Sequence, residues 1–131
     1  MQRHILLIDD EPYFRFGIEL ALRKRGYRVS QVSDGEDALQ RILGDAADRP
    51  PLLDLILLDL ELPTLHGAEI MRRLHEEAVA TPVMIFSGFF NALLYQEVMR
   101  LGCLELLFKP VREQMLQDRI ERALKQRRLR Q

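Results

Sequence analysis

The sequence has almost no cysteine, and this scarcity limits the kind of protein it can encode. Cys103 is the single cysteine among 131 residues, so the chain cannot form an internal disulfide. Disulfide frameworks belong to oxidising compartments, and their absence fits a reducing cytoplasm. The three histidines do not gather with the cysteine in a zinc-binding spacing. We therefore expect a cytoplasmic protein that is stabilised by an apolar core.

A long apolar segment and an excess of one charge are also missing. The apolar run at residues 4–8 stops at Asp9 and Asp10, which is too short for a signal peptide or a membrane span. The formal net charge of -1 gives the chain no overall attraction to nucleic acid. With 47% hydrophobic residues, the chain suits one domain over residues 1–131. We expect no membrane contact and no direct nucleic-acid contact.

Short apolar runs alternate with amphipathic segments five times along the chain. The runs predict strands at residues 4–8, 27–32, 53–58, 82–87 and 104–108. The amphipathic segments predict helices at residues 11–26, 33–43, 65–78, 89–102 and 111–131. Residues 44–51 are small, polar and rich in proline, which predicts a loop. The second strand is partly polar, which favours a position at the edge of a sheet.

This alternation favours an α/β fold. Strands that are apolar throughout are typical of a parallel sheet covered by helices on both faces, with right-handed crossovers. The pattern does not by itself give the order of the strands. Whatever the order, parallel strands end at one common edge, and open sheets bind ligands there.

Polar residues follow four of the predicted strands at this edge. They are Asp9 and Asp10 after the first strand, Asp59 after the third, Ser87 after the fourth and Lys109 after the fifth. Carboxylates held close together resist ionisation unless a cation shares the space, and Mg²⁺ prefers such oxygen ligands. A lysine and a hydroxyl facing the same point suit a phosphoryl group, for which Asp59 is the candidate nucleophile.

Four motifs at these strand ends resemble the receiver domain of bacterial two-component response regulators, the CheY-like family. They are IDDE at residues 8–11, LLDLELPTLHG at 57–67, FSG at 86–88 and FKP at 108–110. The resemblance covers essentially the whole chain. It implies a flavodoxin-like (βα)5 fold, which is a doubly wound, five-stranded parallel sheet in the order 2-1-3-4-5 with helices on both faces.

The resemblance also implies a phosphoryl-accepting signalling switch of a phosphorelay. Asp59 would take the phosphoryl group from a sensor histidine kinase. Asp10, Asp59 and the main-chain oxygen of Glu61 would bind Mg²⁺, with Asp9 as an acid just outside these ligands. Such a domain catalyses only its own phosphorylation and hydrolysis, so we do not expect a conventional enzyme. An output domain or an effector protein would receive the signal.

Three further matches and one departure concern the surroundings of Asp59. Ser87 matches the hydroxyl that moves toward the phosphoryl group, and Lys109 matches the family lysine, followed by a cis bond to Pro110. Gly67 matches the glycine after the acceptor loop. Receivers usually carry an aromatic residue three positions before the lysine, where this chain has Leu106. We expect this leucine to weaken or reroute the usual coupling to the output face.

Two positions flanking the phosphoryl pocket predict how long the signal lasts. In the family, the positions of Glu61 and Phe89 tune dephosphorylation. The Phe89 ring could keep the attacking water away, whereas an acidic Glu61 side chain would repel the phosphoryl oxygens or orient that water. We expect slow hydrolysis.

The fourth predicted helix has more apolar residues than one buried stripe requires. They are Phe89, Phe90, Leu93, Leu94, Tyr95, Val98, Met99 and Leu101. An excess of exposed apolar area often marks an interface, and a broad core face is the alternative. Our hypothesis is a partner or homodimer surface on the fourth helix, the fifth strand and the fifth helix. The basic end of the last helix, residues 119–131, is either a solvated helix face or the start of a linker to an output domain.

Less specific interpretations remain open for the same residues. Asp9, Asp10 and Glu11 could simply cap the first helix, and the histidines could be ordinary residues without a metal or phosphorelay role. A receiver-like scaffold that is never phosphorylated is one rival function. An Mg²⁺-dependent aspartyl phosphatase is another, although its motif requires an aspartate where this chain has Glu61. Asp54, at the start of the third strand, lies at the wrong edge of the sheet and is given no chemistry.

Overall fold

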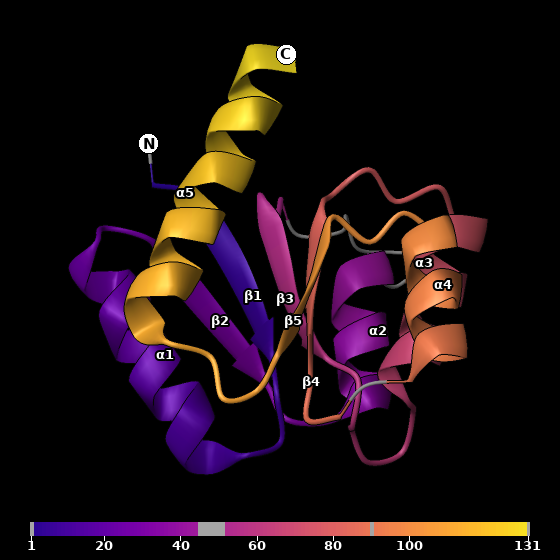
Figure 1. Ribbon diagram of the computed structural model, residues 1–131. Helices are drawn as coiled ribbons and strands as arrows, with labels where there is room; N and C mark the ends of the chain where they lie inside the picture. Colours follow the sequence, from indigo (N-terminus) through magenta and orange to yellow (C-terminus); the bar gives the residue numbers. More distant parts are fainter. Residues whose placement is uncertain (1, 45–51, 90, 131) are drawn as a thin grey trace.

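The computed structural model describes residues 2–44, 52–89 and 91–130 (Figure 1). Strands and helices alternate as β1 (His4–Ile8), α1 (Pro12–Lys24), β2 (Arg28–Val32), α2 (Gly35–Leu43), β3 (Leu55–Asp59), α3 (Gly67–Glu76), β4 (Val83–Ser87), α4 (Ala92–Arg100), β5 (Glu105–Phe108) and α5 (Glu113–Arg130). The strands form one parallel sheet in the order β2-β1-β3-β4-β5. This confirms the flavodoxin-like fold and places the partly polar β2 at an edge. Most of the predicted loop at residues 44–51 lies outside the described residues.

Two apolar layers hold the helices against the sheet. Helices α1 and α5 cover one face, and α2, α3 and α4 cover the other (Figure 1). Along β1, Ile5 and Leu7 pack under α1 and α5, whereas Leu6 and Ile8 pack on the opposite side. Successive side chains of a strand point to opposite faces, so a strand covered on both sides needs an unbroken apolar sequence. This is why the central strands lack the polar alternation of a half-exposed sheet.

Side-chain caps fix where the helices begin. The Asp34 carboxylate caps α2 by accepting the Asp37 N–H. The prediction that the fourth helix begins at residue 89 was wrong by three residues, because Asn91 caps α4 by accepting the Leu94 N–H. The third and fifth helices likewise begin two residues later than their apolar periodicity predicted. Within the described part of the chain, no helix is apolar over a length that could cross a bilayer.

Candidate functional site

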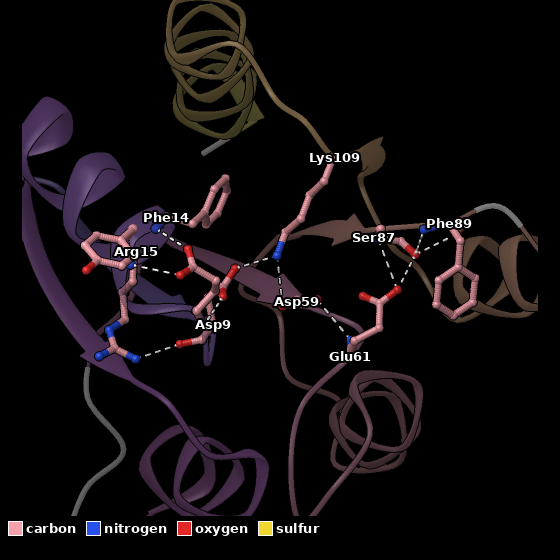
Figure 2. A network of polar contacts seen from close by, with 11 residues as sticks. Asp9, Phe14, Arg15, Asp59, Glu61, Ser87, Phe89 and Lys109 are labelled. Atoms are coloured by element: carbon pink, nitrogen blue, oxygen red, sulfur yellow. Dashed lines mark hydrogen bonds and ion pairs between the residues drawn. The ribbon is translucent and has the colours of Figure 1, made fainter.

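The carboxyl edge of the sheet brings the predicted polar residues together (Figure 2). Asp59 and Ser87 are the last residues of β3 and β4, while Asp9 directly follows β1 and Lys109 directly follows β5. Asp9, Asp59 and Ser87 are buried, with 0%, 2% and 2% of their surface exposed. Buried polar side chains need partners, and here Asp9 and Asp59 share Lys109, while the Ser87 hydroxyl bonds to Glu61.

Lys109 joins the two buried carboxylates. Its Nζ donates to Asp9 Oδ2 and to Asp59 Oδ2, both at 3.0 Å. The same ammonium lies 4.7 Å from the centre of the Phe14 ring, which adds a cation–π contact. Burial opposes the charge on Lys109, but the hydrogen bonds to Asp9 and Asp59 outweigh it and raise its pKa. The site therefore holds a fixed positive charge beside Asp59.

One lysine does not fully compensate the Asp59 carboxylate. Burial raises the pKa of Asp59 to about 7, and the neighbouring Glu61 carboxylate adds to the shift. The Glu61 N–H and Lys109 act in the opposite direction. Near neutral pH, Asp59 therefore carries its full charge only if more positive charge enters the site.

An acidic cluster lies where that extra charge would bind. Asp9, Asp10 and Asp59 each offer a carboxylate oxygen, and these oxygens lie within 4.8 Å of one another. Asp10 is exposed, so the cluster is open to solvent on one side. A donor set made only of oxygens suits Mg²⁺, which retains several of its waters. The residues present fit a magnesium site of the kind that receiver domains use.

Glu61 lies between Asp59 and Ser87 (Figure 2). Its N–H donates to Asp59 Oδ1 at 3.0 Å, while its Oε1 accepts from the Ser87 hydroxyl at 2.8 Å and from the Gly88 N–H at 3.1 Å. Burial opposes ionisation of Glu61, but hydrogen bonds with Asp59, Ser87 and Gly88 hold its pKa below the usual value. The sequence predicted a ligand role for the main-chain oxygen of Glu61 and a tuning role for its side chain, but not this contact.

Phe89 is the second residue predicted to tune dephosphorylation, and Leu106 stands at the position that usually carries an aromatic residue. The Phe89 ring is 60% exposed and lies on the far side of Glu61 from Asp59 (Figure 2). Its main chain contacts Ser87, since its carbonyl oxygen is 2.8 Å from Ser87 Oγ. Leu106 is partly buried against the core that α2, α3 and α4 cover.

The loops around the site are tightly fitted. The Lys109–Pro110 peptide bond is cis. A Cβ atom on Gly67 would lie 2.7 Å from the main-chain oxygen of Asp59 and from the Leu60 Cα, so only glycine fits there. His66 caps α3 by accepting the Ala68 N–H at its Nδ1, which is a structural role.

Two residues of α1 that support the site were missed from the sequence. Phe14 is an apolar residue of the first helix, but its position beside Lys109 depends on how α1 packs on the sheet. Arg15 Nη1 donates to the main-chain oxygen of Asp9 at 2.8 Å, and its Nε donates to Gln31 on β2. No sequence signal separates this arginine from the other basic residues of the helix.

A doubly wound parallel sheet with a lysine, a hydroxyl and an acidic cluster at its carboxyl edge defines a receiver-type signalling domain. The chain belongs to the response regulator receiver domain family, whose model matches residues 5–121. These domains are the signalling switches of two-component systems and not conventional enzymes.

Curated relatives and a solved structure support this assignment. The C4-dicarboxylate transport transcriptional regulatory protein DctD of Pseudomonas aeruginosa is 33% identical over 98% of this chain, which spans 26% of that protein. Sporulation initiation phosphotransferase F of Bacillus subtilis is 29% identical, with 95% of both chains covered. A CheY-like receiver domain from Methanospirillum hungatei JF-1 superposes over all of both chains with a TM-score of 0.90 at 20% identity, which shows the shared fold. The chain spans about a quarter to just over half of most of the curated relatives it matches.

Proposed function

We propose that Asp59 accepts a phosphoryl group from a sensor histidine kinase and that this changes the face the domain presents to its partners. The supporting observation is a buried Asp59 carboxylate that contacts Lys109 and adjoins a solvent-open acidic cluster. An oxygen of Asp59 attacks the phosphorus, and a P–O bond forms as the bond from phosphorus to the kinase histidine nitrogen breaks. The electron pair of that bond stays on the histidine. Lys109 and the Ser87 hydroxyl then face the phosphoryl oxygens and stabilise their charge.

Mg²⁺ is part of the proposal. Asp10, Asp59 and the main-chain oxygen of Glu61 would hold the ion, and Asp9 would remain beside it, bound to Lys109. Bound there, the cation would offset the negative charge of the carboxylates and of the phosphoryl oxygens. Because it favours the ionised form of Asp59, it would also make that carboxylate a better nucleophile.

The test is a mass spectrum after incubation with acetyl phosphate and MgCl₂. We expect the native chain to gain the mass of one phosphoryl group and Asp59→Asn to gain none. Asp54→Asn is the matched control, because it makes the same change beside the other end of β3. An adduct that survives Asp59→Asn, or no adduct on the native chain, would contradict the proposal. The latter result would favour the scaffold function, and repeated turnover of a generic phosphate ester would favour the phosphatase.

A second part of the proposal concerns the surface of α4, β5 and α5. Within α4, Val98 is buried while Leu93, Tyr95 and Met99 are exposed. Phe108 at the end of β5 is exposed as well, whereas Phe90 lies outside the described residues. Apolar side chains spread over adjoining elements are typical of an interface. We propose that a second copy of the domain, or an output domain or effector, covers this surface after phosphorylation.

Light scattering tests the second copy as the occupant. With beryllium fluoride and Mg²⁺ as the phosphoryl mimic, we expect the mass of a dimer for the native chain, and a lower dimer fraction for Leu93→Ser. A monomer in both states at high protein concentration would contradict dimer formation and leave an output domain or effector as the partner.

The lifetime of the phosphoryl group is the remaining part of the proposal. Shielding by Phe89 would require its exposed ring to turn toward Asp59, so Glu61 is the nearer of the two tuning residues. Leu106 provides neither a ring nor a hydroxyl to follow the movement of Ser87. The test is the rate at which phosphorylated Phe89→Ala loses its phosphoryl group. A rate equal to or slower than that of the native chain would exclude shielding by Phe89.

A further inference from the structure

The side chain of Glu61 occupies two hydrogen-bond donors at the carboxyl end of β4. Its Oε1 accepts from the Ser87 hydroxyl and from the Gly88 N–H, at 2.8 and 3.1 Å. Both donors lie at the end of the strand that pairs directly with β3, where Asp59 is in register with Phe86. A phosphoryl group attached to Asp59 would need these donors in addition to Lys109.

The main chain of Glu61 is fixed at Asp59, and Ser87 has a second partner besides Glu61. Its N–H is bound to Asp59 Oδ1, so the backbone starts at the acceptor carboxylate and the side chain crosses to β4 (Figure 2). Ser87 Oγ also lies 2.8 Å from the carbonyl oxygen of Phe89. The hydroxyl has a single proton, so it is directed either at Glu61 or at this carbonyl and not at Asp59. In this arrangement the Ser87 hydroxyl already has hydrogen-bond partners other than Asp59.

We propose that the Glu61 carboxylate is an internal occupant of the phosphoryl subsite, which keeps the unphosphorylated switch off until the phosphoryl group displaces it. This inference rests on the proposed function of Asp59. A carboxylate and a phosphoryl group are both anionic acceptors, so they compete for the same two donors and repel each other. Glu61 is only partly buried, and its carboxylate can therefore swing into solvent when it is displaced.

Displacement of the Glu61 carboxylate would link phosphorylation of Asp59 to a change in the β4–α4 loop. While Glu61 accepts its hydrogen bond, Ser87 stays at the end of β4 beside the first residues of the β4–α4 loop. Once the phosphoryl group takes the hydroxyl and the Gly88 N–H, that loop loses its tie to the β3–α3 loop. Glu61 then changes the energy of the off state, and not only the rate at which water removes the phosphoryl group.

The test is the affinity for beryllium fluoride in the presence of Mg²⁺, followed through the amide NMR signals. Glu61→Ala removes the competing acceptor, and we expect binding roughly tenfold tighter than in the native chain. Glu61→Gln keeps an oxygen that can accept from Ser87 and Gly88, so its affinity should lie between the two. Glu36→Ala removes an acidic residue from the exposed first turn of α2 and should bind like the native chain.

A second measurement needs neither Mg²⁺ nor the mimic. In the free protein, Glu61→Ala should shift the Gly88 amide signal upfield and speed its hydrogen exchange, while Glu61→Gln should change it less. Equal affinities for the Ala and Gln variants would indicate plain charge repulsion and overturn the inference. An unchanged affinity, or an unchanged Gly88 amide in Glu61→Ala, would overturn it too. If the native chain shows no Asp59-dependent binding at all, the proposed function fails, and the inference fails with it.

Discussion

Strand β3 has an aspartate at each end, and the two differ in how their charge is compensated. Asp54 precedes the strand, and its two oxygens accept from the Arg3 guanidinium at 3.2 Å and from the His4 N–H at 2.8 Å. Its side chain is partly open to solvent. Asp59 ends the strand, is almost completely buried and shares the Lys109 ammonium with Asp9. The same residue type therefore serves two purposes on one strand.

The difference lies in what each aspartate lacks. Asp54 has a cation of its own and a main-chain N–H, so it ties the start of β1 to the start of β3 and needs nothing more. Asp59 is buried and shares a single cation, Lys109, with Asp9. Burial and the neighbouring Glu61 raise the pKa of Asp59 to about 7. A carboxylate left in this condition gains from any cation that binds beside it. Under the proposed function, this incomplete compensation would favour the binding of a metal ion and a phosphoryl group at Asp59.

Among the variants that test this difference between Asp54 and Asp59, Lys109→Met should change the free energy of unfolding most. Methionine keeps much of the length of the side chain beside Phe14 but removes the charge shared by Asp9 and Asp59. Removing one partner of a buried ion pair leaves the others uncompensated, so we expect a loss of about 2–4 kcal/mol in the free energy of unfolding at pH 8 without Mg²⁺. Urea denaturation followed by circular dichroism measures it, since the chain has no tryptophan for fluorescence.

Two controls make the Lys109 result specific. Saturating Mg²⁺ should recover part of the loss, because the bound ion supplies positive charge to the same carboxylates. Lys125→Met, at an exposed position of α5, should change the free energy of unfolding by less than about 0.5 kcal/mol. Equal losses for the two lysines would mean that the charge of Lys109 does not support the buried acids.

Much of the fold and of this edge could be predicted from the sequence, because both depend on local patterns. Five short, largely apolar runs predict five strands, and the common direction of parallel strands collects Asp59, Ser87 and Lys109 at one edge. The order of the strands came from the family resemblance. No local pattern encodes it, since it depends on where each crossover helix packs.

The contacts around Asp59 could not be predicted in the same way. The reach of Glu61 to Ser87 depends on the register between β3 and β4, and on a loop conformation that Gly67 permits. An exposed apolar stripe on α1, formed by Tyr13, Phe16 and Leu20, was also missed. The helix has apolar residues on more than one side, and periodicity does not say which side faces the sheet.

A smaller effect, of opposite sign, should come from Asp59→Asn in Mg²⁺-free buffer. Burial raises the folded-state pKa of Asp59 from its ordinary value of 3.8 to about 7, so the native state binds more protons than the unfolded state between these values. The contribution of Asp59 to the free energy of unfolding is therefore fully present below pH 4, and it is lost as the pH rises to 7. Asparagine removes the buried charge, and we expect the variant to be more stable by roughly 1–3 kcal/mol at pH 8, with the gain vanishing toward pH 4.

Asp54→Asn completes this prediction as the matched variant at the other end of β3. Asparagine has one acceptor oxygen where Asp54 uses two, so either the His4 N–H or the Arg3 guanidinium loses its partner. These groups are partly exposed and water can replace the lost bond, which limits the expected loss of stability to about 1 kcal/mol. Denaturation of both variants at pH 8 should therefore give opposite signs. If Asp59→Asn is also destabilised there, Asp59 is as well compensated as Asp54, and the electrostatic distinction between the two ends of β3 is wrong.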